Sequence, residues 1–260
     1  MKRACIMGHP VAHSRSPMLH GYWLRTLGID GVYEHADVPP EKFEAFFRGL
    51  KRNGYVGGNI TIPHKEAAFR LVDRRERAAD AIGAVNTVWY EGDTLVGGNT
   101  DWYGIVASLD DIHPGWDAAP GRALVLGAGG SARASVFAFL ERKFSVALVN
   151  RTRDRAEKLA AQFGPRVSVH AWSEVPRLLG ETEVLINNTS LGMAGKPPLE
   201  LDLAPRRLVH DQLLRRLLDR LDVERRHHLG QVGDVRLGEH RPRKDRLREH
   251  PALLVLVGVA

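Results

Sequence analysis

Short apolar segments alternate with longer amphipathic ones from the start of the chain. The short runs, each of a length typical of a buried strand, are residues 3–8, 31–38 and 55–62. The segments between them, 16–28 and 40–54, have the apolar spacing of helices, and Pro40 suits a first helical turn. This alternation predicts an α/β fold with parallel strands and crossover helices.

The first predicted helix begins at a serine and a proline. Pro17 suits the first turn of a helix, and the preceding Ser16 is predicted to be its N-cap. A capping serine can also line a binding site, so the prediction leaves a second role for Ser16 open.

A polar, proline-bearing interval at residues 111–121 interrupts the alternation and predicts a domain junction. The pattern predicts a first, mixed α/β domain at 1–110 and a second domain at 122–205. The strands predicted in the second domain are 122–127, 144–150, 167–172 and 183–189, and its helices are 130–143 and 152–164. A strand, a glycine turn, a helix and a strand in this order are typical of a Rossmann-type, doubly wound dinucleotide-binding domain.

Three glycines lie at the turn after the strand at 122–127. Gly127, Gly129 and Gly130 have no side chain, so the backbone can approach a pyrophosphate that faces the free amides of the next helix. Ala132 stands where a regular G-x-G-x-x-G pattern has its third glycine, so a tight turn that binds nothing is the alternative.

The end of the strand at 144–150 favours NADP over NAD. An NAD-binding domain usually has an acidic residue there for the ribose hydroxyl, whereas this chain has Asn150, Arg151 and Thr152. We expect Arg151 to bind the 2′-phosphate, Thr152 to donate a hydrogen bond and Arg155 to supply a second cation. The alternative is that these arginines form a solvated helix start.

Composition and charge limit the class of protein. The chain has 260 residues, 43% of them hydrophobic, and no apolar run is long enough to span a membrane. The single cysteine, Cys5, is predicted to be a buried strand residue, and a cytoplasmic location is expected. The net charge is +6, and residues 206–260 carry +5 of it, from 13 Lys and Arg against 8 Asp and Glu.

Polar side chains of the first domain gather at the ends of predicted strands, where open α/β sheets build their sites. They occur in HSRSP (13–17), NITIPHK (59–65), AVNT (84–87) and GGNTD (97–101). No metal-ligand spacing and no nucleophile elbow occurs, so we expect no metal site and a small polyhydroxylated acid as the ligand. Four histidines are expected only to make local hydrogen bonds or to lie at the surface: His9, His13, His20 and His64.

Seven segments, in order, resemble the shikimate dehydrogenase family of NADP-dependent enzymes, which reduce 3-dehydroshikimate to shikimate. They are GHPVAHSRSPMLH, GGNITIPHKEAAF, AIGAVNTV, GGNTDWYGI, LVLGAGGSARA, VNRT and NNTSLGM. The resemblance extends over about residues 3–203 and implies a two-domain α/β oxidoreductase of aromatic amino acid and chorismate biosynthesis. Quinate is an alternative substrate that these segments do not exclude.

The resemblance also implies the site residues. Ser14 and Ser16 would bind the substrate carboxylate, and the residues around the ring hydroxyls would be Asn59, Thr61, Asn86 and Asp101. With the residues expected above, the cofactor site would comprise Gly127, Ala128, Gly129, Gly130, Ser131, Asn150, Arg151, Thr152, Arg155, Thr189, Ser190 and Met193.

The resemblance makes Lys65 the catalytic residue, with Asp101 holding and orienting it. Hydride delivery to a ketone leaves an alkoxide, and a lysine at the reacting oxygen can both stabilise that charge and supply a proton. The alternative for Lys65 alone is a surface lysine at a helix start. We expect Trp102 and Tyr103 to begin a packed linking helix rather than to stack on a cofactor.

Residues 206–260 depart from the family pattern. The family continues with a Tyr-Asp-x-x-Tyr-x-Pro stretch and a glutamine that contacts the substrate, whereas this chain has no aromatic residue after Trp172. A frame-shifted segment and a truly different one both fit this change. We expect an amphipathic helix at 208–226, a late strand or a sticky end at 252–259, and otherwise poor packing.

Two functions stay open on this evidence. The first is an NADP-dependent shikimate dehydrogenase, and the second is a catalytically impaired relative that keeps the nucleotide-binding fold. From the atypical tail we predict weak or absent shikimate oxidation. The expected partners are small molecules, with no membrane and no nucleic acid, since the basic tail has no interleaved aromatics for base stacking. The protein is expected to be a monomer or a homodimer.

Overall fold

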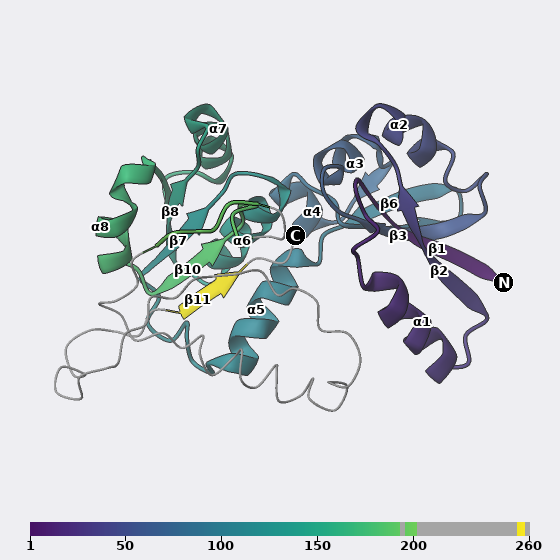
Figure 1. Ribbon diagram of the computed structural model, residues 1–260, viewed down its shortest axis with the longest axis horizontal. Helices are drawn as coiled ribbons and strands as arrows, with labels where there is room; N and C mark the ends of the chain where they lie inside the picture. The colour runs from purple at the N-terminus through teal and green to yellow at the C-terminus, as the bar shows by residue number, and fades with distance from the viewer. Residues whose placement is uncertain (193–195, 202–253, 258–260) are drawn as a thin grey trace. The chain divides into compact units, whose positions relative to one another are not determined.

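The computed structural model describes residues 1–192, 196–201 and 254–257. The chain forms two compact units, Met1–Gly104 and Ile105–Ala260, and each has its own sheet (Figure 1). The helix predicted at 208–226 lies outside the described residues. Within the described part, no helix has the length and apolar character that a membrane crossing requires.

The first unit contains a mixed six-stranded sheet. Its strands, in the order β2-β1-β3-β5-β6-β4, are β1 (Lys2–Gly8), β2 (Gly31–Asp37), β3 (Tyr55–Ile60), β4 (Arg74–Arg75), β5 (Thr87–Glu91) and β6 (Thr94–Gly98). Strand β1 is parallel to β2 and β3, as predicted, but β5 is antiparallel to both β3 and β6. Strands β5 and β6 are antiparallel because only Gly92 and Asp93 separate them, and so short a turn leaves no room for a crossover.

Four helices follow the strands of the first unit: α1 (Ser16–Thr26), α2 (Pro40–Arg48), α3 (Lys65–Leu71) and α4 (Arg77–Ile82). Helix α2 buries Phe43 and Phe47 in the core of this unit, whereas α1 buries no residue. Cys5 is fully buried in β1, which confirms its prediction.

The prediction that Ser16 caps α1 is wrong. Arg15 occupies the cap position, and its side chain makes no capping hydrogen bond. Ser16 is already helical, and its backbone N–H donates to Oγ of Ser14 at 3.3 Å. The serine that accepts a hydrogen bond from the helix start is therefore two residues earlier than expected.

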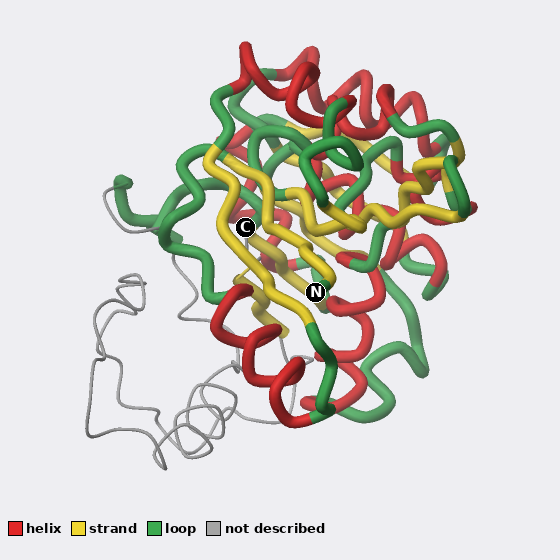
Figure 2. Tube along the Cα trace, turned by 90° about the vertical axis from the view of Figure 1, so that its right-hand side faces the viewer, coloured by secondary structure: helices red, strands yellow, loops and turns green. Residues whose placement is uncertain are grey.

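The second unit has a parallel five-stranded sheet, and Figure 2 colours the strands of both units yellow and their helices red. Its strands, in the order β11-β10-β7-β8-β9, are β7 (Arg122–Leu126), β8 (Ser145–Val149), β9 (Val167–His170), β10 (Val184–Asn187) and β11 (Leu254–Val257). Its helical segments are α5 (Asp101–Ile112), α6 (Gly130–Glu141), α7 (Arg153–Phe163), a 3-10 turn at Trp172–Glu174 and α8 (Val175–Gly180). The strands and helices predicted for 122–189 and the late strand predicted within 252–259 are confirmed.

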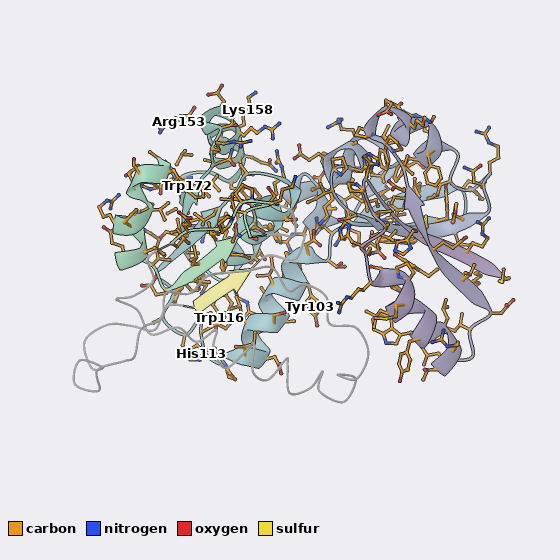
Figure 3. All side chains as sticks on the ribbon, viewed as in Figure 1. Tyr103, His113, Trp116, Arg153, Lys158 and Trp172 are labelled. Carbon is orange, nitrogen blue, oxygen red and sulfur yellow. The ribbon has the colours of Figure 1, made fainter. Side chains whose placement is uncertain are left out.

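The boundary between the units falls at Gly104 and Ile105, inside α5 and before the predicted junction at 111–121. The junction segment belongs to the second unit because Trp116 packs on Phe144, with ring centroids 5.2 Å apart. Its indole N–H also donates to Asp110 at 2.9 Å. Figure 3 labels Trp116 and the 63% exposed Tyr103 on α5.

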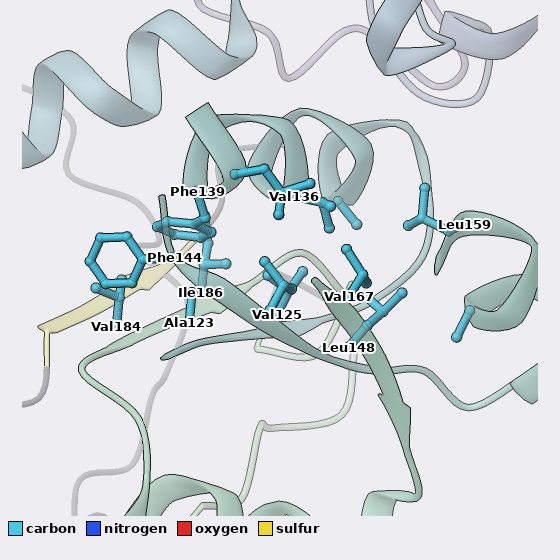
Figure 4. Packing of buried hydrophobic residues seen from close by; sticks show 14 of the residues in the cluster. Ala123, Val125, Val136, Phe139, Phe144, Leu148, Leu159, Val167, Val184 and Ile186 are labelled. Carbon is cyan, nitrogen blue, oxygen red and sulfur yellow. The ribbon is translucent and has the colours of Figure 1, made fainter. Parts of the chain in front are cut away.

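Alternate residues of β7 enter two separate cores, as expected for a doubly wound sheet. Ala123 and Val125 pack with Val136 and Phe139 of α6 (Figure 4). Leu124, on the opposite face, belongs to the cluster that α8 completes. A strand buried on both faces therefore holds the glycine turn at its end.

Phe139→Ala should lower the free energy of unfolding by about 3–5 kcal/mol, because it empties a fully buried site in this core. Urea unfolding of the full-length protein measures the change.

Tyr103→Ala is the matched control, since it removes a ring that is 63% exposed, and it should change stability by about 0.5 kcal/mol or less. An equal loss in both variants would contradict the core assignment.

Candidate functional site

Lys65 and Asp101 form a largely buried ion pair in the first unit. Lys65 begins α3 and Asp101 begins α5, and Nζ of Lys65 donates to Oδ2 of Asp101 at 2.8 Å. The Lys65 side chain is 8% exposed and that of Asp101 is 25% exposed. The alternative of a surface lysine at a helix start is therefore wrong: its helix does begin there, but the side chain is directed into the unit.

Asn86 holds the other carboxylate oxygen of this pair. Its Nδ2 donates to Oδ1 of Asp101 at 2.7 Å and to Oγ1 of Thr100 at 3.1 Å. Its Oδ1 accepts the backbone N–H of Thr100 at 3.0 Å and the hydroxyl of Thr87 at 2.9 Å. The backbone donor fixes which end of the carboxamide faces Asp101.

Asn99 fixes the start of α5 through a hydrogen bond to its backbone. Its Oδ1 accepts the backbone N–H of Asp101 at 3.0 Å, while its Nδ2 donates to the carbonyl of Ala84. Asn86 and Asn99 are both buried, so each amide has the partners that burial requires. Asp101 is held through its backbone and both carboxylate oxygens.

The buried His64 anchors the turn before Lys65. Its Nε2 lies 2.6 Å from the carbonyl oxygen of Val38, so this nitrogen carries the proton, and its ring stacks on Phe43 at 4.1 Å. Burial lowers the pKa of His64 below its ordinary 6.5. The prediction of a local hydrogen-bonding role for His64 is confirmed.

The other three histidines for which this role was predicted also have local partners or lie at the surface. His9 is paired with Asp37, its Nδ1 lying 2.7 Å from Oδ1. His20 stacks on Tyr33, and His13 is exposed. No group of His, Cys, Asp or Glu in the described part of the chain could hold a metal ion.

The remaining predicted substrate residues lie at the end of β3 and at the start of α1. Asn59 joins the lysine network, because its Nδ2 donates to Thr87 at 3.0 Å. Ser14 and Ser16 pair with each other, their hydroxyls 3.2 Å apart. Thr61 follows β3, and its backbone N–H donates to the carbonyl of Met7 at 2.9 Å.

Gly127 ends β7 in a conformation and a space that only glycine fits. Its φ is +111°, and a Cβ there would lie 2.8 Å from the carbonyl oxygen of Asn188. Nothing lies within 4 Å of a Cβ added at Gly129, which leaves open space beside the first turn of α6. Ala132 stands at the place of the third glycine, and its methyl group is fully buried in the core of the second unit.

Two cations with no competing partner follow β8, one before α7 and one in its first turn. Among the described residues, the side chains of Arg151 and Arg155 make no hydrogen bond or ion pair and are exposed. Arg153, by contrast, pairs with Glu157 at 2.7 Å and points outward from α7 (Figure 3). Asn150 fixes the turn by donating from Nδ2 to the carbonyl of Thr152 at 2.8 Å.

The loop after β10 contains the last predicted cofactor residues. Thr189 donates from Oγ1 to Oδ1 of the buried Asn187 at 2.7 Å, and Ser190 is exposed. Ala128 lies within the glycine turn and Ser131 follows it, and both are half-buried, while Met193 lies outside the described residues. Asn187 lies in the segment NNTSLGM but was not predicted as a site residue, because its side chain contacts Thr189 of the chain itself.

The two parts of the chain match two family models. Residues 6–88 match the shikimate dehydrogenase substrate binding domain, and residues 112–193 match shikimate / quinate 5-dehydrogenase. A shikimate dehydrogenase (NADP(+)) of Azorhizobium caulinodans is 54% identical over 205 residues, which cover 78% of this chain and 73% of the relative. One of Brucella abortus is 51% identical over 214 residues, with coverage of 80% and 74%.

Solved structures with the same fold include two shikimate dehydrogenases. That of Aquifex aeolicus has a TM-score of 0.71 and 35% identity, and the match covers 78% of this chain and 74% of that one. That of Thermus thermophilus in complex with NADP(H) and shikimate has a TM-score of 0.64 and 37% identity, with coverage of 76% and 74%.

Stability should fall as the pH falls below about 6.5, because the unfolded chain then protonates His64 before the folded protein does. His64→Phe keeps a ring against Phe43 but removes this titration, so the free energy of unfolding should depend less on pH between about 7 and 5. Urea unfolding at a series of pH values measures the slope.

The exposed His13 supplies the matched control, since His13→Gln removes a histidine without removing a buried ring. If the free energy of unfolding of His64→Phe depends on pH as steeply as that of the parent, His64 does not contribute to the pH dependence.

Proposed function

The chain belongs to the shikimate dehydrogenase family, and we propose on this premise that it catalyses the reversible, NADP-dependent reduction of 3-dehydroshikimate to shikimate. The observation that carries the proposal is the 2.8 Å pair of Lys65 and Asp101, held in one network with Asn86 and Asn59. Its place in metabolism would be the biosynthesis of chorismate and the aromatic amino acids.

In this proposal Lys65 is the acid and base at the reacting oxygen. In the reductive direction its ammonium group donates a proton to the oxygen that becomes a hydroxyl, and in the oxidative direction the amine takes that proton back. Asp101 holds Nζ in place and stabilises its positive charge, while Asn86 prevents the carboxylate from turning away. Bound NADP supplies the hydride acceptor or donor.

Substrate binding would use neutral and charged donors at the strand ends. We assign the carboxylate of the substrate to Ser14 and Ser16 and its ring hydroxyls to Asn59, Thr61, Asn86 and Asp101. Hydroxyl and amide groups suit such a ligand because each can donate or accept according to the orientation of the ring hydroxyl. Quinate shares the carboxylate and ring hydroxyls, so it belongs in the same assay.

The second unit fits a 2′-phosphorylated dinucleotide. A side chain at Gly127 would strike the loop at Asn188, and the open space at Gly129 lets a pyrophosphate approach the amides that start α6. Arg151 and Arg155 are available for the 2′-phosphate, with Thr152 as a further donor. Ala128, Gly130, Ser131, Asn150, Thr189 and Ser190 complete the proposed cofactor site.

The alternative of an impaired relative depends on residues 206–260, of which the structure describes only β11. That strand pairs in parallel with β10, next to the loop that we assign to the cofactor. We also propose a cytoplasmic enzyme, where reduced nicotinamide cofactor is supplied, acting as a monomer or homodimer without nucleic acid.

The tail alone led us to predict weak or absent shikimate oxidation, but the family match leads us to expect that the parent protein forms NADPH from shikimate and NADP. Lys65→Ala should lower kcat by about 100- to 10,000-fold through loss of proton transfer. NADP affinity should stay within about 2-fold of the parent, since the lysine is assigned to the reacting oxygen. Absorbance of NADPH with shikimate and, separately, with quinate measures the rates.

Lys51→Ala is the control, because Lys51 is an exposed lysine of the same unit that pairs with Asp93. Retention of most of the rate in Lys65→Ala would refute its role. A parent that turns over neither substrate would refute the proposed activity and favour the impaired relative.

Arg151→Ala should reduce the preference for NADP over NAD by about 10- to 100-fold, the effect expected when a charge-assisted hydrogen bond to a phosphate is lost. Titration of each cofactor, followed by protein fluorescence, measures the two affinities.

Arg153→Ala removes the neighbouring arginine that is paired with Glu157, so it should leave the preference nearly unchanged. Equal affinity of the parent for NADP and NAD would rule out a 2′-phosphate site at β8.

A further inference from the structure

Strand β2 presents three polar residues at alternate positions. Tyr33, His35 and Asp37 lie on one face of the strand, because side chains two residues apart point the same way. Tyr33 donates its hydroxyl to Oδ1 of Asn59 at 2.6 Å, and Nε2 of His35 lies 2.8 Å from the carbonyl oxygen of Ser14. One edge strand thus reaches both groups of substrate residues assigned above.

The loop before α1 needs these contacts because the helix has no hydrophobic anchor. No residue of α1 is buried, so core packing does not fix its position. The loop is held by the fully buried Val11, whose carbonyl accepts the N–H of Ser14 at 3.0 Å, and by His35. His20 of α1 also stacks on the ring of Tyr33, with centroids 4.1 Å apart.

We propose that Tyr33 and His35 are positioning residues for substrate binding: Tyr33 orients the carboxamide of Asn59, and His35 places the loop of Ser14 and Ser16. The inference rests on the proposed function, since Asn59 and the two serines are its substrate residues. Neither Tyr33 nor His35 is assigned a contact with the substrate.

The directions of the hydrogen bonds show what Tyr33 controls. Its hydroxyl donates to Oδ1 of Asn59, which leaves Nδ2 to donate to Thr87. Burial raises the pKa of Tyr33, so the hydroxyl remains a donor across the working range of pH. Without this donor, Oδ1 of Asn59 loses its hydrogen bond to Tyr33, and the carboxamide is then held through Nδ2, by Thr87 and by the carbonyl of Asn86 at 3.4 Å.

The catalytic pair does not depend on this contact. The backbone N–H of Thr100 fixes the Asn86 carboxamide independently, and Asn86 in turn holds Asp101. Loss of the Tyr33 hydroxyl should therefore affect ground-state binding of the substrate and leave proton transfer by Lys65 unchanged. Loss of substrate positioning by Tyr33 should therefore raise KM without changing kcat, which reports proton transfer by Lys65.

Tyr33→Phe and His35→Leu, each made in the full chain, should raise KM for shikimate by about 3- to 10-fold, while kcat and KM for NADP stay within about 2-fold of the parent. His35→Gln keeps an N–H donor and should restore most of the affinity lost in His35→Leu. Tyr55→Phe is the matched control. Tyr55 belongs to the same sheet, but its hydroxyl accepts from Arg3 at 3.3 Å and contacts none of the proposed substrate residues.

Hydrogen exchange provides a measurement that needs no turnover. Amides of residues 12–20 should exchange about 3- to 10-fold faster in His35→Leu than in the parent, since a loop contact is lost, and Tyr55→Phe should leave them unchanged. Thermal unfolding of each variant identifies a general loss of stability, which would speed exchange throughout the unit.

The results of these experiments test the positioning role and the proposed function separately. If the parent oxidises shikimate but both variants keep its KM, the positioning role is overturned and the proposed function stands. If the parent has no turnover, the proposed function fails, and the exchange of residues 12–20 still decides whether His35 holds the loop. A fall in kcat equal to the rise in KM would overturn the separation from Lys65.

Discussion

The ion pair between Lys65 and Asp101 is the contact on which the polar structure of the first unit depends. The Lys65 side chain is 8% exposed, so its ammonium group loses most of its hydration, and a well-placed carboxylate compensates for that loss. The carboxylate must then be fixed itself, which is the role of Asn86 and Asn99. This requirement explains why two amides lie buried where β5 begins and β6 ends, in positions that apolar side chains would otherwise fill.

The two units would bind their ligands in different ways, the first through side chains and the second mostly through backbone. In the first, side chains with defined donors and acceptors form a network, so the chemistry that we propose would depend on Lys65, Asp101 and Asn86 individually. In the second, most of the proposed contact comes from backbone at the glycine turn, and side chains add the preference for a 2′-phosphate. Substitutions at the first site should therefore alter reaction and substrate affinity, whereas substitution of Arg151 alters the choice of cofactor.

Sequence patterns predicted the second unit best because each of its central strands is a short, continuous apolar run, buried on both faces. They gave no direction for β5, which depends on the two-residue turn after it, and they failed for the cap of α1, where Ser14 rather than Ser16 accepts the hydrogen bond. Family resemblance identified Lys65 and Asp101. Nothing local indicated Tyr33 or His35, since their partners lie 26 and 21 residues away along the chain.

The strand order explains why Gly127 and the loop at Asn188 must approach so closely. From β7 the chain continues through β8 and β9 on one side of the sheet, and β10 then returns to the other side. The carboxyl ends of β7 and β10 thus meet where the strand order reverses, which is the position at which open α/β sheets bind ligands. Because a Cβ at Gly127 would lie 2.8 Å from the carbonyl oxygen of Asn188, a side chain there would displace the loop that carries Thr189. The glycine is needed as much for the contact between these two loops as for the approach of a pyrophosphate.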